Sequence, residues 1–229
     1  MKRHHDLAAA LLMWAALLTW DIGGADGVVT RWFGSAQGFA WRDHFITAGL
    51  VHQGGRLLAW ATLLALLVCA LRAPRSAVVG MGTGAGAASS PVRAHRWYWL
   101  AVTVLSLLLV PAIKRTSATS CPWDLAEFGG SARTVSHWLW GLADGGPGHC
   151  FPSGHAVGAF AFFSQYFLWR NVRPGRARVW LLLVLVTGGV FGVGQLARGA
   201  HHLSHSLWSG WLCWALSAAA NRAQPQRWR

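Results

Sequence analysis

The sequence predicts an all-α integral membrane protein, a single domain of 229 residues built as a bundle of six transmembrane helices. The first observation is composition: 54% of the residues are apolar and only 12% are charged, whereas a soluble domain carries about 25% charged residues. The second is that the charges gather between long apolar runs. The third is the unequal distribution of Lys and Arg over these gaps, which gives the helices an orientation.

Six apolar runs provide the predicted helices. Several are shorter than the roughly 20 residues that a bilayer crossing needs. Trp, small residues and Arg flank them, however, and these can occupy the membrane interface. In chain order the runs are 7–20, 57–71, 97–113, 156–169, 179–197 and 207–220.

Three segments outside the later runs need a separate interpretation. The first run follows the basic start KRHHD, as a signal peptide would, but DIGGADG after it has no clean small-x-small cleavage site, so we expect an uncleaved helix. Residues 27–56 interleave Trp, Phe and Arg, which favours an interfacial amphipathic loop or short helix. Residues 76–90, rich in Gly, Ala and Ser, predict a flexible cytoplasmic linker without chemistry.

The basic residues predict which side of the membrane each loop occupies. With an inner N-terminus and six crossings, 13 of the 20 Lys and Arg residues fall in inner segments and six of the seven acidic residues in outer ones. Since Lys and Arg accumulate in short cytoplasmic loops, both chain ends are expected in the cytoplasm and the outer loops in the periplasm. Membrane topology then accounts for the net charge of +13, and no nucleic-acid partner is expected. The inner basic residues are Lys2, Arg3, Arg72, Arg75, Arg93, Arg96, Arg170, Arg173, Arg176, Arg178, Arg222, Arg227 and Arg229.

Three polar clusters fall on the predicted outer side, at the mouths of helices. They occupy residues 113–130, 149–155 and 194–205. Ionisable residues near membrane depth are costly and commonly mark a functional site. These clusters are therefore expected to converge on one site.

The second cluster, HCFPSGH, has the composition of an anion-binding helix N-terminus. Pro152 suits a first helical turn, and Ser153 and Gly154 offer backbone N–H groups to an anion. His155 can exchange a proton near neutral pH. The alternative is an ordinary Ser cap followed by an interfacial His.

The third cluster has helical spacing. Arg198, His201 or His202, and His205 lie three, four or seven residues apart, which predicts a shared helix face. Arg can bind phosphate through its planar fork, and a His can act as nucleophile or base while a neighbour orients it. The alternatives are a polar interfacial patch and a metal site built on His201 and His205. No Glu lies between them and no third ligand is evident, so no metal is expected.

The first cluster begins at the end of the third apolar run. Lys114 and Arg115 lie just beyond it, and Cys121, Pro122 and Asp124 follow. The two basic residues either interact with the helix dipole or, if they face an anion site, bind phosphate.

In this order the three clusters resemble the motifs of the type 2 phosphatidic acid phosphatase (PAP2) family: Lys-x6-Arg-Pro, Pro-Ser-Gly-His and Ser-Arg-x5-His-x3-Asp. The resemblance covers the six-helix layout and the chain from about Lys114 to His205. The middle motif is complete. Cys121 replaces the Arg of the first motif, Gly194 and Gln195 stand in place of Ser-Arg, and His205 stands in place of Asp. The set is similar to a bacterial subgroup with CPWDL, FPSGH and RGAH, some members of which act on envelope lipids including lipid A.

The resemblance implies a phosphatase that uses neither a metal nor another cofactor. His201 would attack phosphorus and form a phosphohistidine, and His155 would protonate the leaving alkoxide. The phosphate oxygens would be bound by Lys114, Ser153, the Gly154 N–H and Arg198.

The departures from the family motifs leave two roles open. The family Asp fixes the tautomer of the nucleophilic His, and a neutral His205 supplies no negative charge. Our hypothesis is that Asp124 or Glu127 provides the carboxylate. Arg115 or Arg133 could replace the missing first-motif Arg, and the sequence does not choose between them.

The four cysteines divide into two pairs. Cys69 and Cys213 lie within predicted helices and are expected to pack there. Cys121 and Cys150 both lie on the outer side, each beside a motif. In an oxidising periplasm they could form a disulfide, which spacing alone does not establish.

Together these observations predict a multi-pass enzyme of the bacterial inner membrane that hydrolyses a phosphomonoester or diphosphate of an envelope lipid at the periplasmic face. The candidate substrates are phosphatidic acid, phosphatidylglycerophosphate, undecaprenyl diphosphate and lipid A. Three alternatives remain: a phosphotransferase with a polyprenyl diphosphate donor, a weakened member that only binds phospholipid, and a transporter-like bundle lined by Lys114 and Arg198.

Overall fold

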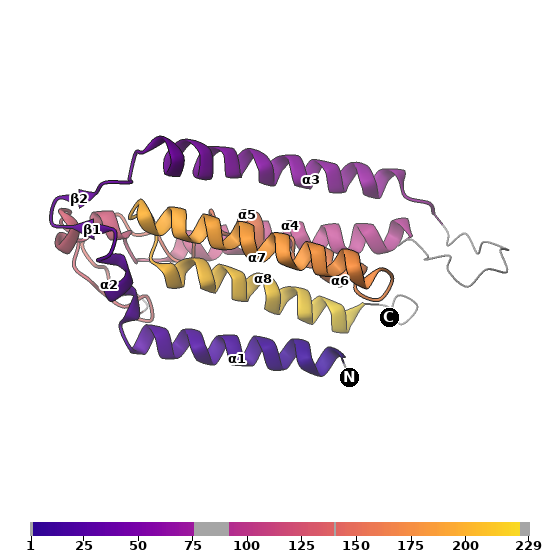
Figure 1. The fold of residues 1–229 in the computed structure, drawn as a ribbon. Helices are drawn as coiled ribbons and strands as arrows, with labels where there is room; N and C mark the ends of the chain where they lie inside the picture. The colour runs from indigo at the N-terminus through magenta and orange to yellow at the C-terminus, as the bar shows by residue number, and fades with distance from the viewer. Residues whose placement is uncertain (1, 76–91, 140, 225–229) are drawn as a thin grey trace.

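The chain forms a bundle of long helices with irregular segments gathered at one end (Figure 1). The structure is a computed structural model and describes residues 2–75, 92–139 and 141–224; the predicted linker at 76–90 lies outside this range. The long helices are α1 (Lys2–Ile22), α3 (Gly55–Arg72), α4 (Arg93–Thr116), α7 (Pro174–Ala197) and α8 (Leu203–Ala223). The shorter elements are α2 (Ala25–Thr30), β1 (Gly34–Ser35), β2 (Gly38–Phe39), the π-helix η1 (Phe45–Gly54), the 3-10 turns η2 (Pro122–Asp124) and η3 (Ala126–Phe128), α5 (Val157–Phe160) and α6 (Phe163–Trp169).

Each predicted apolar run lies in a helical segment, and almost no sheet forms in the described residues. Four segments are long and apolar enough to cross a membrane: His4–Ile22, Phe45–Arg72, Arg93–Thr116 and Pro174–Ala197. Val157–Trp169 is apolar but shorter. The all-α prediction is confirmed, whereas four of the six predicted spans meet this criterion.

The second span is longer than predicted because η1 continues directly into α3. Phe45–Gly54 lies within residues 27–56, whose interleaved Trp, Phe and Arg predicted an interfacial amphipathic loop or short helix. Instead it forms a π-helix, and His44 caps its start by accepting a hydrogen bond from the Ile46 N–H, 3.2 Å away.

The last helix, α8, is the central helix of the bundle. It packs against α1, α4, α5, α6 and α7. Four of its serines are almost completely buried, which shows that its small polar side chains face these neighbours. Such residues let helix backbones approach closely inside a membrane, and they also lower the mean hydropathy of the segment. The serines are Ser204, Ser206, Ser209 and Ser217.

The short helix α5 packs closely against α7 and α8 at two glycines, Gly188 and Gly210. The ring of Phe160 lies so close to α7 that a Cβ at Gly188 would be 2.2 Å from its Cε1 atom, and a Cβ at Gly210 of α8 would be 3.3 Å from the same ring. Phe160 also belongs to the apolar core with Phe163 and Val184. The close packing of α5 between α7 and α8 therefore requires a residue without a side chain at 188.

We expect Gly188→Val to destabilise the bundle by about 1–3 kcal/mol, since the added methyl groups overlap the Phe160 ring. The neighbouring Gly189 provides the control, because nothing lies within 4 Å of the Cβ position there. Thermal unfolding in detergent should show a lower midpoint for Gly188→Val than for Gly189→Val. Equal midpoints would contradict this packing.

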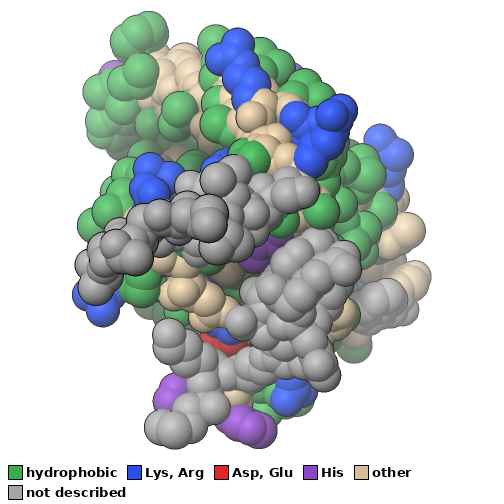
Figure 2. All heavy atoms as spheres, turned by 90° about the vertical axis from the view of Figure 1, so that its right-hand side faces the viewer, with side chains coloured by type: hydrophobic (Ala, Val, Ile, Leu, Met, Phe, Trp, Pro, Cys, Tyr) green, Lys and Arg blue, Asp and Glu red, His purple; other side chains and the backbone are tan. Residues whose placement is uncertain are grey.

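The two ends of the bundle differ in charge. Figure 2 views the end at which α1 begins and α8 ends; Lys and Arg side chains are spread over it and acidic side chains are nearly absent from view. Arg72 ends α3, Arg93 begins α4 and Arg222 is in the last turn of α8. The opposite end carries α2, β1, β2, η2 and η3, which position the candidate site (Figure 1).

A buried ion pair closes the basic end. Arg170, which caps the C-terminus of α6, donates from Nη1 to both carboxylate oxygens of Asp6 in α1, at 2.8 Å each. Both residues are at most 6% exposed. A pair of this kind gives specific pairing of two helices, because removing either partner leaves a buried charge.

Candidate active site

The segment before α5 is fixed by hydrogen bonds to α8. The Ser153 N–H donates to the His205 carbonyl (3.0 Å), and the Ser209 hydroxyl donates to the Ser153 carbonyl (2.9 Å). The Ser153 hydroxyl accepts a bond from the Ala156 N–H (3.3 Å), as a helix cap does, which leaves its own hydrogen as a donor. The cap interpretation and the phosphate-binding one are therefore compatible.

Lys114, in the last turn of α4, lies beside Gly154. A Cβ at position 154 would be 3.5 Å from Lys114 Cδ and 3.8 Å from Nζ. Any larger residue there would occupy the space next to the ammonium group. The structure thus brings the first and second motifs together at one point.

His201 is on the loop between α7 and α8. This corrects the prediction that Arg198, His201 or His202, and His205 share one helix face. Gly199 adopts a left-handed backbone (φ 70°) and ends α7, and a Cβ there would be 2.3 Å from the Phe39 ring. The turn allows the His201 N–H to donate to the Gln195 carbonyl (3.3 Å), and the buried ring lies against Cys150.

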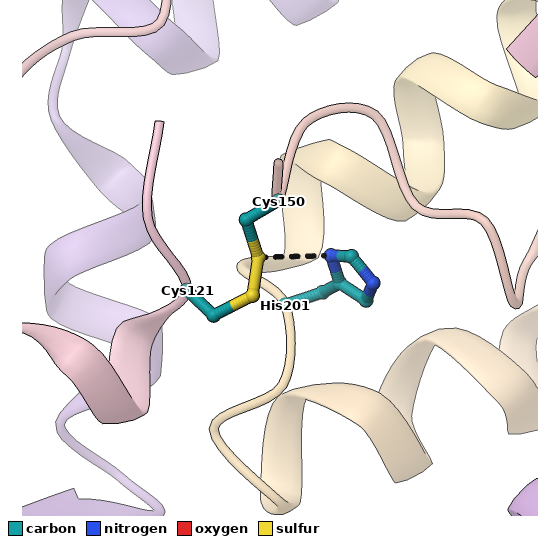
Figure 3. A group of neighbouring side chains, drawn as sticks. All are labelled: Cys121, Cys150 and His201. Atoms are coloured by element: carbon teal, nitrogen blue, oxygen red, sulfur yellow. Dashed lines mark hydrogen bonds between the residues drawn. A yellow bond between two sulfur atoms is a disulfide. The ribbon is translucent and has the colours of Figure 1, made fainter. Parts of the chain in front are cut away.

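The Cys121–Cys150 pair forms a disulfide against the His201 ring (Figure 3). His201 Nδ1 lies 3.4 Å from Cys150 Sγ. Burial and then the Lys114 charge lower the pKa of His201 well below its ordinary value, and a bond to the Cys150 backbone opposes them. The imidazole is therefore neutral near pH 7, as a nucleophile must be.

His205, at the position of the family Asp, does not face the His201 Nδ1 atom. Its own Nδ1 lies 3.1 Å from the Cys150 carbonyl, which only accepts, so Nδ1 carries the hydrogen. The His201 and His205 ring centroids are 5.8 Å apart. His205 therefore positions the Cys150 segment, and Cys150 in turn contacts His201.

Asp124 and Glu127, the two candidates for a carboxylate beside His201, both bind other residues. The Asp124 carboxylate accepts from the Cys121 N–H (3.3 Å), and Glu127 pairs with Arg31. This geometry favours the Cys150 backbone over either carboxylate as the group beside His201. Asp124 instead helps to position the disulfide.

His155 packs between two rings, neither of which the sequence identified as part of the site. Its ring centroid is 4.6 Å from that of His52 in η1 and 4.4 Å from that of Phe191. His52 Nδ1 is in turn 3.0 Å from Gln195 Nε2. Burial and then the His52 charge lower the pKa of His155 to about 4. Its buried Nε2 atom has no hydrogen-bond partner among the described residues.

The three arginines proposed from the sequence to bind phosphate lie in different surroundings. Arg198 donates from Nε to the Arg42 carbonyl (2.8 Å), and its charge acts on His155. Arg115 and Arg133 have exposed side chains. Of the three, Arg198 is the one that the structure brings near His155.

A buried carboxylate holds the two disulfide-bearing segments together. Asp144 accepts from the Ser120 N–H (2.6 Å), the Ser120 hydroxyl (2.8 Å) and the Gly146 N–H (2.9 Å). Burial raises the pKa of Asp144, but these bonds outweigh it and the net shift is downward. The Cys150 N–H also donates to the Thr119 carbonyl (2.9 Å).

A cavity of about 540 Å³ opens beside the second motif, between α3, α4 and α5, with Phe191 of α7 in its wall. Gly154, His155 and Arg56 form its polar end. A volume of this size accommodates a drug-sized or lipid-like ligand. Apolar side chains form most of the remaining wall: Ala59, Trp60, Leu63, Val104, Leu107, Leu108, Val157 and Phe191.

The donor atoms of Cys121, Cys150 and His201 form a compact group. With the cysteines joined, neither sulfur carries a charge, so this oxidised form offers a metal ion no anionic ligand. The arrangement can instead bind an anion at Lys114 and Gly154 and present a neutral imidazole to it.

Comparison with known proteins gives one match. The family model for the PAP2 superfamily matches residues 95–229, which include all three motifs. Neither the curated proteins nor the solved structures contain a match to this chain.

Proposed function

Because the chain belongs to the PAP2 superfamily, whose members are generally phosphatases, we propose that it hydrolyses a phosphomonoester or diphosphate of an envelope lipid. The observation that carries this proposal is the convergence of a buried neutral His201 with Lys114 and Gly154. Phosphoryl transfer depends mainly on positioning and charge neutralisation, which these groups supply.

In the proposed first step, His201 Nε2 attacks phosphorus while the Cys150 segment holds the Nδ1 side of the ring. The P–O bond to the lipid breaks, and His155 gives its proton to the leaving alkoxide. Burial keeps the pKa of His155 low, and a bound phosphate dianion raises it, because a nearby negative charge favours the imidazolium. His155 therefore takes up its proton as substrate binds.

In the second step, His155, now neutral, accepts a proton from water, and the resulting hydroxide attacks the phosphohistidine. The P–N bond breaks, phosphate leaves and His201 is regenerated. Lys114, the Ser153 hydroxyl, the Gly154 N–H and Arg198 bind the non-bridging oxygens in both steps.

The charge asymmetry of the bundle supports a periplasmic site in the bacterial inner membrane. The basic end, where α1 begins and α8 ends, faces the cytoplasm. The site lies toward the other end, at the mouths of α4, α5 and α8. A cavity with apolar walls and a polar end fits a lipid whose head group reaches the site while its chains stay in the bilayer.

The direct test is release of free phosphate by purified protein in detergent, with EDTA present. The panel holds phosphatidic acid, phosphatidylglycerophosphate, undecaprenyl diphosphate and lipid A, and a His201→Ala variant is run beside the wild type. Release by the wild type alone supports a metal-independent hydrolase and identifies its lipid. Transfer from undecaprenyl diphosphate to a lipid acceptor without free phosphate would support the phosphotransferase instead.

Lys114→Met is expected to lower kcat/KM by about 10²–10³-fold, because the variant loses the charge that stabilises the transferring phosphoryl group. Its neighbour Arg115, exposed at the end of α4, is the matched control, and Arg115→Met is expected to stay within about threefold of the wild type. Steady-state kinetics on the substrate found above would decide. Equal losses in the two variants would contradict the separate roles.

A further inference from the structure

Three side chains that can bind a metal converge at the turn between α7 and α8. The two sulfurs of Cys121 and Cys150 and a ring nitrogen of His201 all lie within 4.8 Å of one another. They come from three separate segments: the loop after α4, the loop before α5 and the turn between α7 and α8 (Figure 3). Only the covalent bond between the sulfurs prevents this group from acting as a ligand set.

We propose that reduction of the Cys121–Cys150 disulfide creates a Zn²⁺ site formed by both cysteine thiolates and His201 Nδ1, and that Zn²⁺ bound there inhibits the enzyme. Metal binding follows from the ligand geometry alone. The inhibition rests on the proposed function, in which His201 is the nucleophile.

The reduction needs a thiol or dithiol reductant and balances as an ordinary exchange. A reductant thiolate attacks Cys121 Sγ, since Cys121 is partly exposed while Cys150 is fully buried. The S–S bond breaks and Cys150 leaves as a thiolate. A second reductant thiol then displaces Cys121, so the protein gains two electrons and the reductant becomes a disulfide.

One ligand distance already fits a tetrahedral zinc site, and the other two require the sulfurs to move apart. Zn–S bonds of about 2.3 Å and Zn–N bonds of about 2.0 Å at tetrahedral angles place S and N about 3.5 Å apart and the two sulfurs about 3.8 Å apart. Cys150 Sγ is already 3.4 Å from His201 Nδ1. Once the bond is broken, van der Waals repulsion separates the sulfurs to nearly the required distance. Water would complete the coordination.

The surrounding backbone holds each ligand in place without the disulfide. The Cys121 N–H bonds to Asp124, the Cys150 N–H to the Thr119 carbonyl, and the His201 N–H to the Gln195 carbonyl. These bonds do not involve sulfur and survive reduction.

The charges also favour Zn²⁺. Two thiolates balance the charge of one Zn²⁺, and the nearby Lys114 ammonium, which acts on His201, stabilises thiolates over thiols. Thiolate sulfur with imidazole nitrogen is a ligand combination that zinc prefers.

Zinc on Nδ1 would block the nucleophile through the tautomer of the ring. A neutral imidazole has one nitrogen with a free lone pair and one that carries hydrogen. If Nδ1 binds the metal, the hydrogen must sit on Nε2. Nε2 then has no lone pair with which to attack phosphorus.

The test uses the full chain in detergent, with the other two cysteines replaced (Cys69→Ser and Cys213→Ser) so that only this pair supplies thiolates. The protein is reduced, freed of reductant without air and titrated with Co²⁺. Thiol counting should rise from zero to two per chain on reduction. We expect one Co²⁺ per reduced chain with sulfur-to-cobalt charge-transfer absorption in the near ultraviolet, displaced by Zn²⁺, and no such absorption from oxidised protein.

Further substitutions identify the ligands. Cys121→Ser or His201→Ala in this background should weaken Co²⁺ binding by at least ~10-fold, whereas His202→Ala, a change at the adjacent histidine, should leave it unchanged. Gel filtration confirms that each protein keeps its elution volume. The proposal is overturned by a reduced, folded protein without charge-transfer absorption, by a disulfide that resists excess reductant, or by a reduced protein that aggregates.

Activity separates this proposal from the proposed function. If lipid phosphate is released, stoichiometric Zn²⁺ should inhibit the reduced enzyme and spare the oxidised one. If no substrate is turned over under any condition, the proposed function fails while the Co²⁺ spectrum still decides the metal site. A spectrum with the expected ligands but without zinc inhibition would overturn the inhibitory part.

Discussion

Replacing His201 with Ala is expected to lower lipid dephosphorylation by about 10⁴-fold or more, because loss of a nucleophile removes the covalent route altogether. The side chain is buried, neutral and held against Cys150, so no other described group can take its place at the same point. The measurement is kcat on the lipid identified by phosphate release.

Trapping the intermediate gives an independent readout for this prediction. Substrate labelled in the phosphate should transfer label to the wild-type protein, and the label should be stable in alkali and labile in acid, as a phosphohistidine is. His202→Ala is the matched control, since His202 is the N-cap residue of α8 and its Nδ1 lies 2.8 Å from the Thr30 hydroxyl. Label retained by His201→Ala would show that another residue is the nucleophile.

His155→Ala is expected to lower kcat on the natural lipid by about 10²–10⁴-fold, the range for loss of a general acid. An alkoxide leaves poorly without a proton, whereas p-nitrophenolate needs none. The same variant should therefore lose no more than about tenfold on p-nitrophenyl phosphate. The comparison of the two leaving groups in one protein is the measurement.

This comparison also separates catalysis from folding. A His155→Ala protein that packs badly beside Phe191 would lose both activities equally. Equal losses on the lipid and the aryl phosphate would therefore show that His155 has a structural role instead of a proton-transfer role.

The helices could be predicted from the sequence to a large extent, because each apolar run lies in a helical segment. The predicted helices differ from the observed ones where polar or small residues pack between helices. The start of the second span was placed too late, because residues 45–54 were assigned to the interfacial segment with interleaved Trp, Phe and Arg but form a π-helix that continues into α3. The serine-rich α8 is a full-length helix at the centre of the bundle, although it is not among the four segments long and apolar enough to cross a membrane.

The site was predicted less completely because some of its contacts involve the backbone. Lys114, Gly154 and His201 carry motif signals, and the structure brings them together. The group beside His201 is the main chain and sulfur of Cys150, and no sequence pattern marks a carbonyl for that position. His52 lies 103 residues before His155 in the chain, and only the fold brings the two rings together.

The Asp6–Arg170 pair has a consequence for how the chain is made. The partners are 164 residues apart, so at about 5–20 residues per second the ribosome needs roughly 8–33 s between them. During this time the first helix is already in the bilayer with an uncompensated carboxylate near its start. That carboxylate is held at the aqueous surface until Arg170 emerges. We therefore expect the first helix to complete its packing only after Arg170 has been made, although it is synthesised first.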